Sequence, residues 1–145
     1  MEFILPDGFT EITPLPPGLK ILGPYYGNGA NVIGYRPTFH HIRGKEGNVS
    51  GGVILNLCDF AIGSVIANQV YGPSPDAVNF TTVNTSVDFI SSPKFNTWLE
   101  TEVDVLKIGR TLAFGQCVVK CGDTVICRAN STLALIGTRA NDHSI

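Results

Sequence analysis

The sequence predicts an α+β fold in which one long apolar helix packs against an antiparallel sheet of about six strands. Two observations lead to this fold class. The run Val53–Gln69 is apolar on nearly every helical face, which is typical of a helix buried on several sides. The segments that follow it show strand-like alternation separated by turn residues. The chain has 145 residues, so we expect 1–145 to form a single domain.

The first half of the chain supplies the helix and two strands. Residues 1–20 are rich in proline, which predicts an irregular or one-turn lead-in. Ile21–Tyr26 and Asn31–His41 are two extended runs, and the Gly27-Asn28-Gly29 segment between them indicates a hairpin. Ser50 is the expected N-cap of the helix that follows.

The second half is predicted to contain strands and turns only. Glycines and prolines separate the apolar and β-branched runs, and Gly122-Asp123 predicts a tight hairpin. We expect residues 138–145 to form a frayed tail. The four predicted strands are Val78–Ile90, Trp98–Ile108, Thr111–Cys121 and Thr124–Ile136.

The composition limits the partners that this chain can have. Charged residues make up only 15% of the chain and hydrophobic residues 43%, whereas about 25% charged is usual. This deficit indicates that additional surface is buried, most simply against copies of the same chain. The formal net charge of −2 gives no electrostatic reason to expect nucleic acid or an anionic membrane as a partner.

The N-terminal residues and the cysteines predict a cytoplasmic protein without a metal site. The start MEFILPDGF is acidic where an export signal is basic, and no apolar run reaches the length of a membrane span without interruption. We therefore expect the four cysteines to be reduced, core-filling thiols. Their spacing does not match zinc ligand pairs, and the three histidines lack a convincing set of partner ligands. These residues are Cys58, Cys117, Cys121 and Cys127, and His40, His41 and His143.

Asp59 is the most informative residue of the predicted helix. It is the only charged residue between Glu46 and Asp76, and it shares one helical face with Gly52, Asn56 and Gly63. Most lone helix carboxylates are solvated, cap a helix or form an ion pair. Asp59 is too far into the helix to cap it, and no Lys or Arg lies within one turn. The polar face must therefore meet either a ligand cavity or a closely packed neighbouring helix.

Three segments resemble a known family in order and spacing. Gly47-Asn48-Val49-Ser50-Gly51-Gly52 followed by Leu57-Cys58-Asp59 is similar to the G-x-x-H-G-G…L-x-D signature of phenylacetate-pathway-type acyl-CoA thioesterases. These are hotdog-fold proteins of the 4-hydroxybenzoyl-CoA thioesterase superfamily. The segments Thr82–Lys94 and Leu106–Phe114 also match, so the resemblance covers about residues 21–136. Two positions depart from the family: Ser50 replaces its histidine, and Gly44 stands where an asparagine often occurs. The nearby His41 does not have the spacing to replace the histidine.

The resemblance implies a hotdog fold and hydrolysis of an acyl- or aryl-CoA thioester. Asp59 corresponds to the catalytic carboxylate of the family, acting as general base or nucleophile, and Ser50, in the signature segment, is also expected in the catalytic site. The Gly51 amide at the helix N-terminus would stabilise the oxyanion. Thr82 corresponds to a hydroxyl that orients water, although threonine is also simply a good strand residue. Gly51 and Asp59 are eight positions apart, about 12 Å along a helix, so the oxyanion donor must come from a partner subunit.

The resemblance also implies where the substrate binds. Two segments are expected to contact CoA, and Asn56 is expected to contact the substrate beside Asp59. Lysines and arginines at exposed turns also serve solubility, which is the simpler explanation for those positions. No cofactor is expected, because CoA is part of the substrate. The CoA-binding residues are Phe89, Ile90, Ser91, Ser92 and Lys94 in one segment, and Lys107, Gly109, Arg110 and Thr111 in the other.

The sequence leaves three candidate functions, and it predicts one mode of assembly. An acyl-CoA thioesterase is the leading prediction. A non-catalytic hotdog protein that binds acyl-CoA comes second, because the family's histidine and asparagine are both missing. A hotdog dehydratase comes last, because no histidine precedes the helix in the required position. We expect a homodimer that pairs the strand Val78–Phe89 edge to edge, and a homotetramer built from two such dimers.

Overall fold

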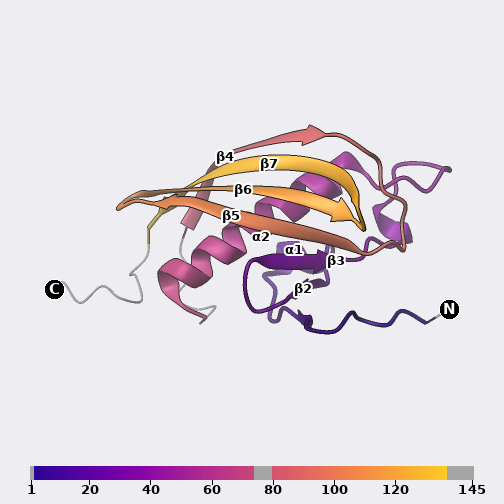
Figure 1. The fold of residues 1–145 in the computed structure, drawn as a ribbon, viewed down its shortest axis with the longest axis horizontal. Coiled ribbons are helices and arrows are strands. Elements are labelled where there is room, and N and C mark those ends of the chain that lie inside the picture. The colour runs from indigo at the N-terminus through magenta and orange to yellow at the C-terminus, as the bar shows by residue number, and fades with distance from the viewer. Residues whose placement is uncertain (1, 74–79, 137–145) are drawn as a thin grey trace.

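The computed structural model describes residues 2–73 and 80–136, in which α2 lies against one face of a seven-stranded antiparallel sheet (Figure 1). The strand order is β1-β2-β3-β5-β6-β7-β4, so β1 and β4 are the two edges. Every pairing within this sheet is antiparallel. The elements are β1 Thr10–Glu11, α1 Pro17–Lys20, β2 Tyr25–Gly27, β3 Val32–Tyr35, η1 Phe39–His41, α2 Gly51–Tyr71, β4 Phe80–Phe89, β5 Leu99–Ile108, β6 Leu112–Cys121 and β7 Thr124–Leu135.

This arrangement confirms the predicted hotdog fold, and α2 is its central helix. α2 extends two residues beyond each predicted end, because Ser50 occupies the N-cap position and Gly72 ends the helix with φ 80°. Ser50 makes no side-chain capping bond; its carbonyl accepts hydrogen bonds from the N–H groups of Val53 and Ile54. By length and composition alone α2 could cross a membrane, but more than half of it is buried by the rest of the protein, as expected for a core helix.

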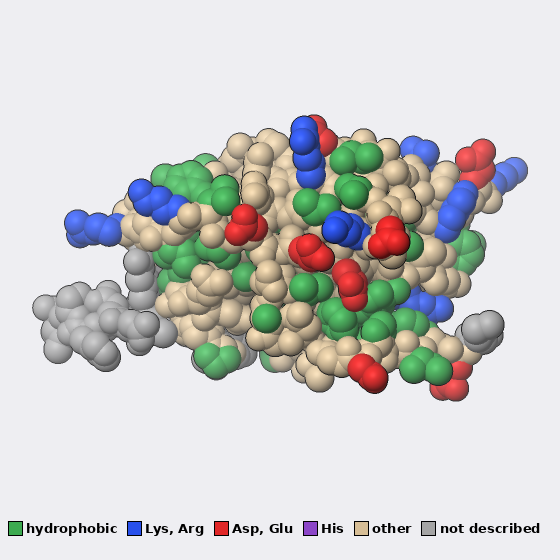
Figure 2. Space-filling view, in the orientation of Figure 1, with side chains coloured by type: hydrophobic (Ala, Val, Ile, Leu, Met, Phe, Trp, Pro, Cys, Tyr) green, Lys and Arg blue, Asp and Glu red, His purple; other side chains and the backbone are tan. Residues whose placement is uncertain are grey.

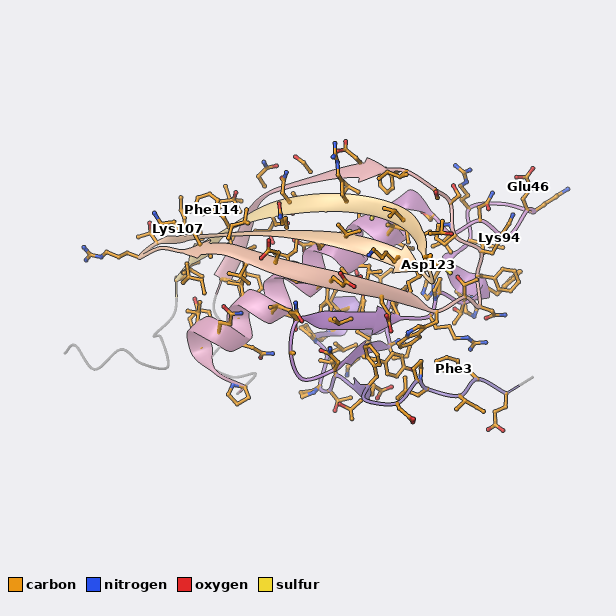
Figure 3. All side chains as sticks on the ribbon, in the orientation of Figure 1. Phe3, Glu46, Lys94, Lys107, Phe114 and Asp123 are labelled. Carbon is orange, nitrogen blue, oxygen red and sulfur yellow. The ribbon has the colours of Figure 1, made fainter. Side chains whose placement is uncertain are left out.

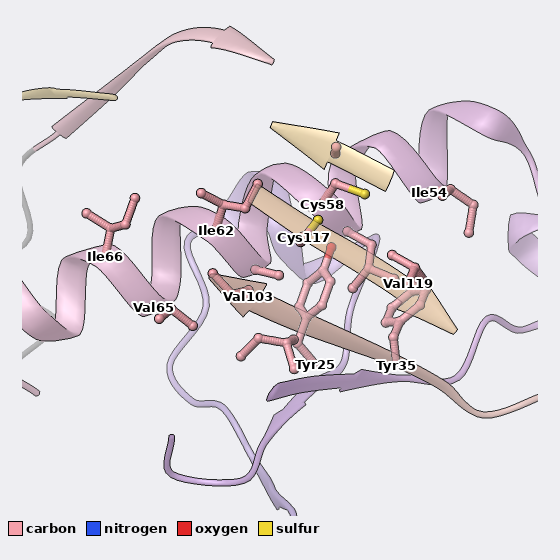
Figure 4. Close-up of a cluster of buried hydrophobic side chains, with 14 of the residues drawn as sticks. Tyr25, Tyr35, Ile54, Cys58, Ile62, Val65, Ile66, Val103, Cys117 and Val119 are labelled. Carbon is pink, nitrogen blue, oxygen red and sulfur yellow. The ribbon is translucent and has the colours of Figure 1, made fainter. Parts of the chain in front are cut away.

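The sheet face that covers α2 forms the hydrophobic core (Figure 4). Gly115 on β6 permits close packing, because a Cβ there would lie 2.7 Å from Cγ2 of Ile62. All four cysteines are free, as predicted, and three of them are buried. The sulfur atoms of Cys58 and Cys127 lie 3.5 Å apart between helix and sheet. The thiols therefore fill space in the core.

The N-terminal part of the chain differs from the prediction. The lead-in contains the one-turn helix α1 and also β1, which pairs with β2 and adds a seventh strand. The two strands predicted over 21–26 and 31–41 are shorter. Pro24 and Pro37 flank β2 and β3, and proline cannot donate a ladder hydrogen bond. The end of the second predicted strand is instead the short helix η1.

The predicted strands of the second half agree with β4 to β7 within about two residues. Val78 and Asn79, at the predicted start of β4, lie outside the described residues, as do the tail 138–145 and His143. On β5, Glu102 and Asp104 are exposed while Leu99 and Val103 are buried, which confirms the predicted alternation. The position of β4 at one edge of the sheet, next to α2, is the feature that builds the site.

Candidate active site

Asp59 lies in the middle of α2 on the side that faces β4, and it is partly exposed. The hydroxyl of Thr82 donates a hydrogen bond of 2.9 Å to its Oδ1. The hydroxyl of Thr85 lies 3.4 Å from the same oxygen. Among the described residues, the other oxygen, Oδ2, has no hydrogen-bond partner. The carboxylate is thus held by one oxygen and presents the other.

A β-bulge in β4 allows both threonines to reach Asp59. Residues three apart on a regular strand point to opposite faces. The pairing of β4 with β7 shifts between Thr82 and Asn84, so Val83 is an extra residue in the ladder. Thr85 is also within 2.8 Å of the hydroxyl of Ser131, which is buried on β7. The bulge therefore connects Asp59 to the interior of the sheet through a chain of hydroxyl groups.

Asn56 is positioned one turn before Asp59 by a buried tyrosine. The hydroxyl of Tyr25 donates a hydrogen bond to Oδ1 of Asn56. The ring of Tyr25 stacks on Phe60 with centroids 4.1 Å apart and on Tyr35 with centroids 5.1 Å apart. Burial raises the pKa of Tyr25 to about 12, so this hydroxyl remains a donor at neutral pH. Asn56 therefore presents its amide nitrogen beside Asp59.

Asp59 separates two hollows of different character. One is an open hollow of about 360 Å³ that Asn56 and residues 82–85 line together with Asp59. The other is a cavity of about 300 Å³ with mainly apolar walls from the lead-in, α2 and β4. A carboxylate between a polar and an apolar hollow is well placed to meet a molecule with a polar half and an apolar half.

The N-terminus of α2 is the second reactive feature of the helix. Within residues 2–73 and 80–136, the N–H groups of Gly51 and Gly52 have no hydrogen-bond partner. The Ser50 N–H donates to the carbonyl of His41 at 2.8 Å. A Cβ at Gly51 would lie 3.6 Å from the ring of Phe89. Two free amides at a helix N-terminus can stabilise a negative oxygen.

The small residues of the α2 face show how the helix runs along β4. Gly51 lies beside Phe89, the last residue of β4, whereas a Cβ at Gly63 would lie 2.9 Å from the ring of Phe80, the first residue. The polar face of α2 therefore meets both a hollow and a closely packed neighbour, which is a strand rather than another helix. Gly51 and Asp59 belong to one continuous helix, about 12 Å apart along its axis.

His41 does not belong to this site. It is buried, and its Nδ1 accepts a 2.9 Å hydrogen bond from the Thr38 N–H. Burial lowers the pKa of His41, in keeping with a neutral ring. The described part of the chain contains no group of three or more His, Cys, Asp or Glu that could hold a metal ion.

The two predicted CoA-binding segments lie at opposite ends of the sheet within one chain. Lys94 lies near the start of α2 and donates a 2.8 Å hydrogen bond to the carbonyl of Glu46. Lys107 lies at the far end of β5 (Figure 3), about 30 Å away for a ten-residue strand. Figure 2 shows Lys and Arg side chains at both ends of the molecule, with acidic and further basic side chains between them. Phe89, Ile90, Ser91 and Ser92 accompany Lys94, and Gly109, Arg110 and Thr111 accompany Lys107.

Sequence reasoning missed Thr85, Ser131 and the apolar wall of the lead-in. Thr85 follows Thr82 by three positions, so a regular strand would turn it away from Asp59. Leu15 and Leu19 lie in a proline-rich segment without periodicity. No signal in the sequence identifies a bulge or an irregular segment that folds back over a helix.

Comparisons with known proteins identify a family and similar folds. Residues 46–129 match the model of the thioesterase superfamily. A Pseudomonas aeruginosa protein named as a candidate esterase is 26% identical over 90% of this chain and 97% of its own length. A Streptococcus mutans protein bound to acetyl-CoA has a TM-score of 0.66 and 17% identity, covering 95% of this chain and 96% of that one. The Escherichia coli PaaI protein from the phenylacetic acid degradation operon has a TM-score of 0.66 and 14% identity, covering 91% and 82%.

Proposed function

Because this chain belongs to the thioesterase superfamily and is therefore a thioester hydrolase, we propose that it hydrolyses an acyl-CoA through Asp59. One observation carries the proposal. Asp59 is held by Thr82 through Oδ1, and it lines both an open hollow with mostly polar residues and a cavity with mainly apolar walls. A thioester carbonyl lies between a polar CoA arm and an apolar acyl group. The substrate therefore has one polar and one apolar half, which match the two hollows that Asp59 lines.

The carboxylate supports two routes to the same products. As a general base, Asp59 accepts a proton from water while the water oxygen attacks the carbonyl carbon. As a nucleophile, Oδ2 attacks first, and water then cleaves the acyl-aspartyl anhydride. In both routes the C–S bond breaks, the sulfur leaves as CoA and takes up a proton, and the acyl group leaves as an acid. Single turnover in isotopically labelled water, followed by mass analysis of Asp59, tests the nucleophilic route: label in the Asp59 carboxylate arises only when water attacks the aspartyl carbonyl of the anhydride. Trapping of the acyl-enzyme with hydroxylamine tests the same intermediate when water attacks the acyl carbonyl instead.

The oxyanion donor in this proposal is the Gly51 N–H of a partner subunit. α2 and β4 run in opposite directions, with Gly51 near Phe89 and Gly63 near Phe80. Two β4 edges that pair antiparallel about a two-fold axis near Asn84 exchange these ends. The Gly51 of one chain then arrives near the Phe80 end of the other, where Asp59 lies. A shared site thus follows from pairing at this edge.

The surface of β4 supports such a homodimer. β4 is a ten-residue edge strand, and the exposed fractions of Val83 and Phe89 are 59% and 55%. Unpaired edges of this length are prone to association, and isologous pairing removes them. The same two-fold axis places Lys94 of one chain and Lys107 and Arg110 of the other at one end of the joined sheet. The two separated CoA segments would then serve one site, and two dimers would form the homotetramer.

The direct test is release of free CoA from a panel of acyl- and aryl-CoA thioesters. Asp59→Asn keeps an acceptor for the Thr82 hydroxyl but removes the base, so we expect kcat to fall by about 10²–10⁴-fold. Asp88→Asn is the matched control, because Asp88 is an exposed β4 carboxylate paired with Arg128 at 2.9 Å. An Asp59→Asn variant as fast as the parent would disprove the assigned role.

Ser50 gives a specific reason to consider a non-catalytic acyl-CoA binding protein. It stands where the family signature has histidine, and it makes no side-chain bond to the start of α2. Isothermal titration combined with the CoA-release assay separates the two functions. Tight acyl-CoA binding without release of CoA from any substrate would favour the binding protein.

A further inference from the structure

We propose that the apolar cavity between the lead-in and α2 holds the acyl group, and that residues 12–19 limit its length. This inference rests on the proposed function, since it assigns the acyl half of the same substrate. The cavity has a volume of about 300 Å³ and reaches Asp59 at one end. The apolar chain of a thioester at Asp59 can therefore enter it directly.

The walls come from three separate parts of the chain. α2 supplies Phe60, Ser64 and Ala67, which follow Asp59 on adjoining faces of the helix. β4 supplies Phe80, the residue that packs on Gly63. The lead-in supplies Leu15 and Leu19. Most of these side chains are apolar, and aromatic rings stand at Phe60 and Phe80.

The charge of the lining excludes the CoA half of the substrate. Among the described residues that line the cavity, Asp59 is the only charged one, and none is Lys or Arg. A phosphate here would lack a cationic partner and would face a carboxylate. An acyl group needs no polar partner, and its burial is favourable in proportion to the apolar area removed from water. The occupant that fits is therefore an apolar acyl group.

The lead-in wall is fixed rather than loosely attached. The Ile12 N–H donates a 2.8 Å hydrogen bond to the carbonyl of Tyr25. At the other end, the Leu19 carbonyl accepts hydrogen bonds from Leu22 at 3.1 Å and from Gly23 at 2.9 Å. Leu15 packs on Gly23, where a Cβ would lie 2.8 Å from its Cδ1. The wall is hydrogen-bonded to β2 at Ile12 and ends in a hydrogen-bonded turn at Leu19 that leads back into β2, so it can set a size limit.

The volume gives the expected size of the acyl group. One water occupies about 30 Å³ of liquid, and a methylene group is of similar size. A cavity of about 300 Å³ therefore holds roughly ten such groups. The expected substrate is a straight acyl chain of about eight to ten carbons, or an aryl group of similar volume such as phenylacetyl.

The first experiment measures kcat/KM for straight-chain CoA thioesters from acetyl to dodecanoyl, with phenylacetyl-CoA as the aryl arm. Each additional buried methylene should raise kcat/KM by about fourfold until the cavity is full near eight to ten carbons. Chains longer than this should show no further increase in kcat/KM. A flat dependence on chain length would overturn the inference, because a filled apolar cavity must respond to each methylene.

Paired variants test whether the lead-in sets the limit. Leu19→Ala should move the preferred length upward by about three carbons, the volume removed, and Ala67→Leu should move it downward by about as much. Leu22→Ala is the matched control, because Leu22 is a partly buried leucine of the same segment that does not line the cavity. The inference would be overturned if Leu22→Ala changed the preferred acyl-chain length as much as Leu19→Ala does. It would also be overturned if neither Leu19→Ala nor Ala67→Leu changed that length.

A binding measurement separates failure of this inference from failure of the hydrolysis proposal. Titration of the whole protein with non-hydrolysable acyl-CoA thioethers of the same lengths requires no turnover. If affinity rises with length and Leu19→Ala shifts the limit while no CoA is ever released, the cavity assignment stands and the hydrolysis proposal fails. If CoA is released but both affinity and kcat/KM are independent of chain length, the hydrolysis proposal stands and the cavity assignment fails.

Discussion

The Gly51 N–H can be removed without disturbing the helix that carries it. Gly51 is the first residue of α2, and its N–H has no partner within the described part of the chain. Proline is favoured at this position, because the missing N–H is unpaired in any case. Ser50 has φ −60° and ψ 137°, the extended conformation that a residue before proline adopts. A new Cβ would lie 3.6 Å from Phe89, an ordinary contact.

Gly51→Pro should therefore separate catalysis from stability. Loss of one oxyanion donor lowers kcat by about 10²–10³-fold, which corresponds to about 3–4 kcal/mol of transition-state stabilisation. The free energy of unfolding should change by less than about 1 kcal/mol, because no hydrogen bond is broken. Gly51→Ala keeps the N–H and is the matched control. The assays are steady-state CoA release and urea unfolding on the same preparations.

Complementation tests whether Gly51 acts on the Asp59 of another chain. Neither Gly51→Pro nor Asp59→Asn alone forms a site with both groups intact. When the two variants exchange subunits at random, about one quarter of all sites combine a wild-type Asp59 with a partner's wild-type Gly51. Activity should therefore return to about one quarter of the parent. Absence of any recovery, with subunit exchange confirmed by native mass spectrometry, would refute the shared site.

Three further predictions concern stability. Thr85→Val leaves the buried Ser131 hydroxyl without its 2.8 Å partner and should lower the free energy of unfolding by about 1–3 kcal/mol. The double variant with Ser131→Ala should regain part of this loss. Urea melts in which the losses of the two single variants simply add would contradict the pairing. Gly115→Ala places a Cβ 2.7 Å from Ile62 and should cost about 1–3 kcal/mol through overpacking, seen as a lower Tm. Burial lowers the pKa of His41 below its usual 6.5, so the unfolded state takes up the proton first and the free energy of unfolding should fall as pH drops below about 6.5. His41→Asn should lose this pH dependence in urea melts near pH 7 and pH 5. If the free energy of unfolding of His41→Asn still falls between these two pH values by as much as that of the parent, another group causes the pH dependence.

The sequence by itself determined the features that depend on local periodicity. The apolar run around Asp59 predicted the core helix, because few other elements remain apolar through that many turns. The alternation on either side of Val103 predicted both the strand β5 and its buried face. The Ser50-Gly51-Gly52 and Asp59 spacing predicted the family and identified Asp59 as the candidate catalytic carboxylate. Each of these signals lies within one continuous stretch of chain.

Only the tertiary structure decided which residues surround Asp59. Thr85 reaches the carboxylate because of a bulge opposite β7, and the pairing of two distant strands is not encoded in either strand alone. Leu15 and Leu19 become a cavity wall because hydrogen bonds to the sheet fold an irregular segment back over α2. Lys94 and Lys107 are separated by the length of β5, although both match the family's CoA-binding segments. These placements depend on contacts between residues far apart in the chain, and local propensity carries no information about them.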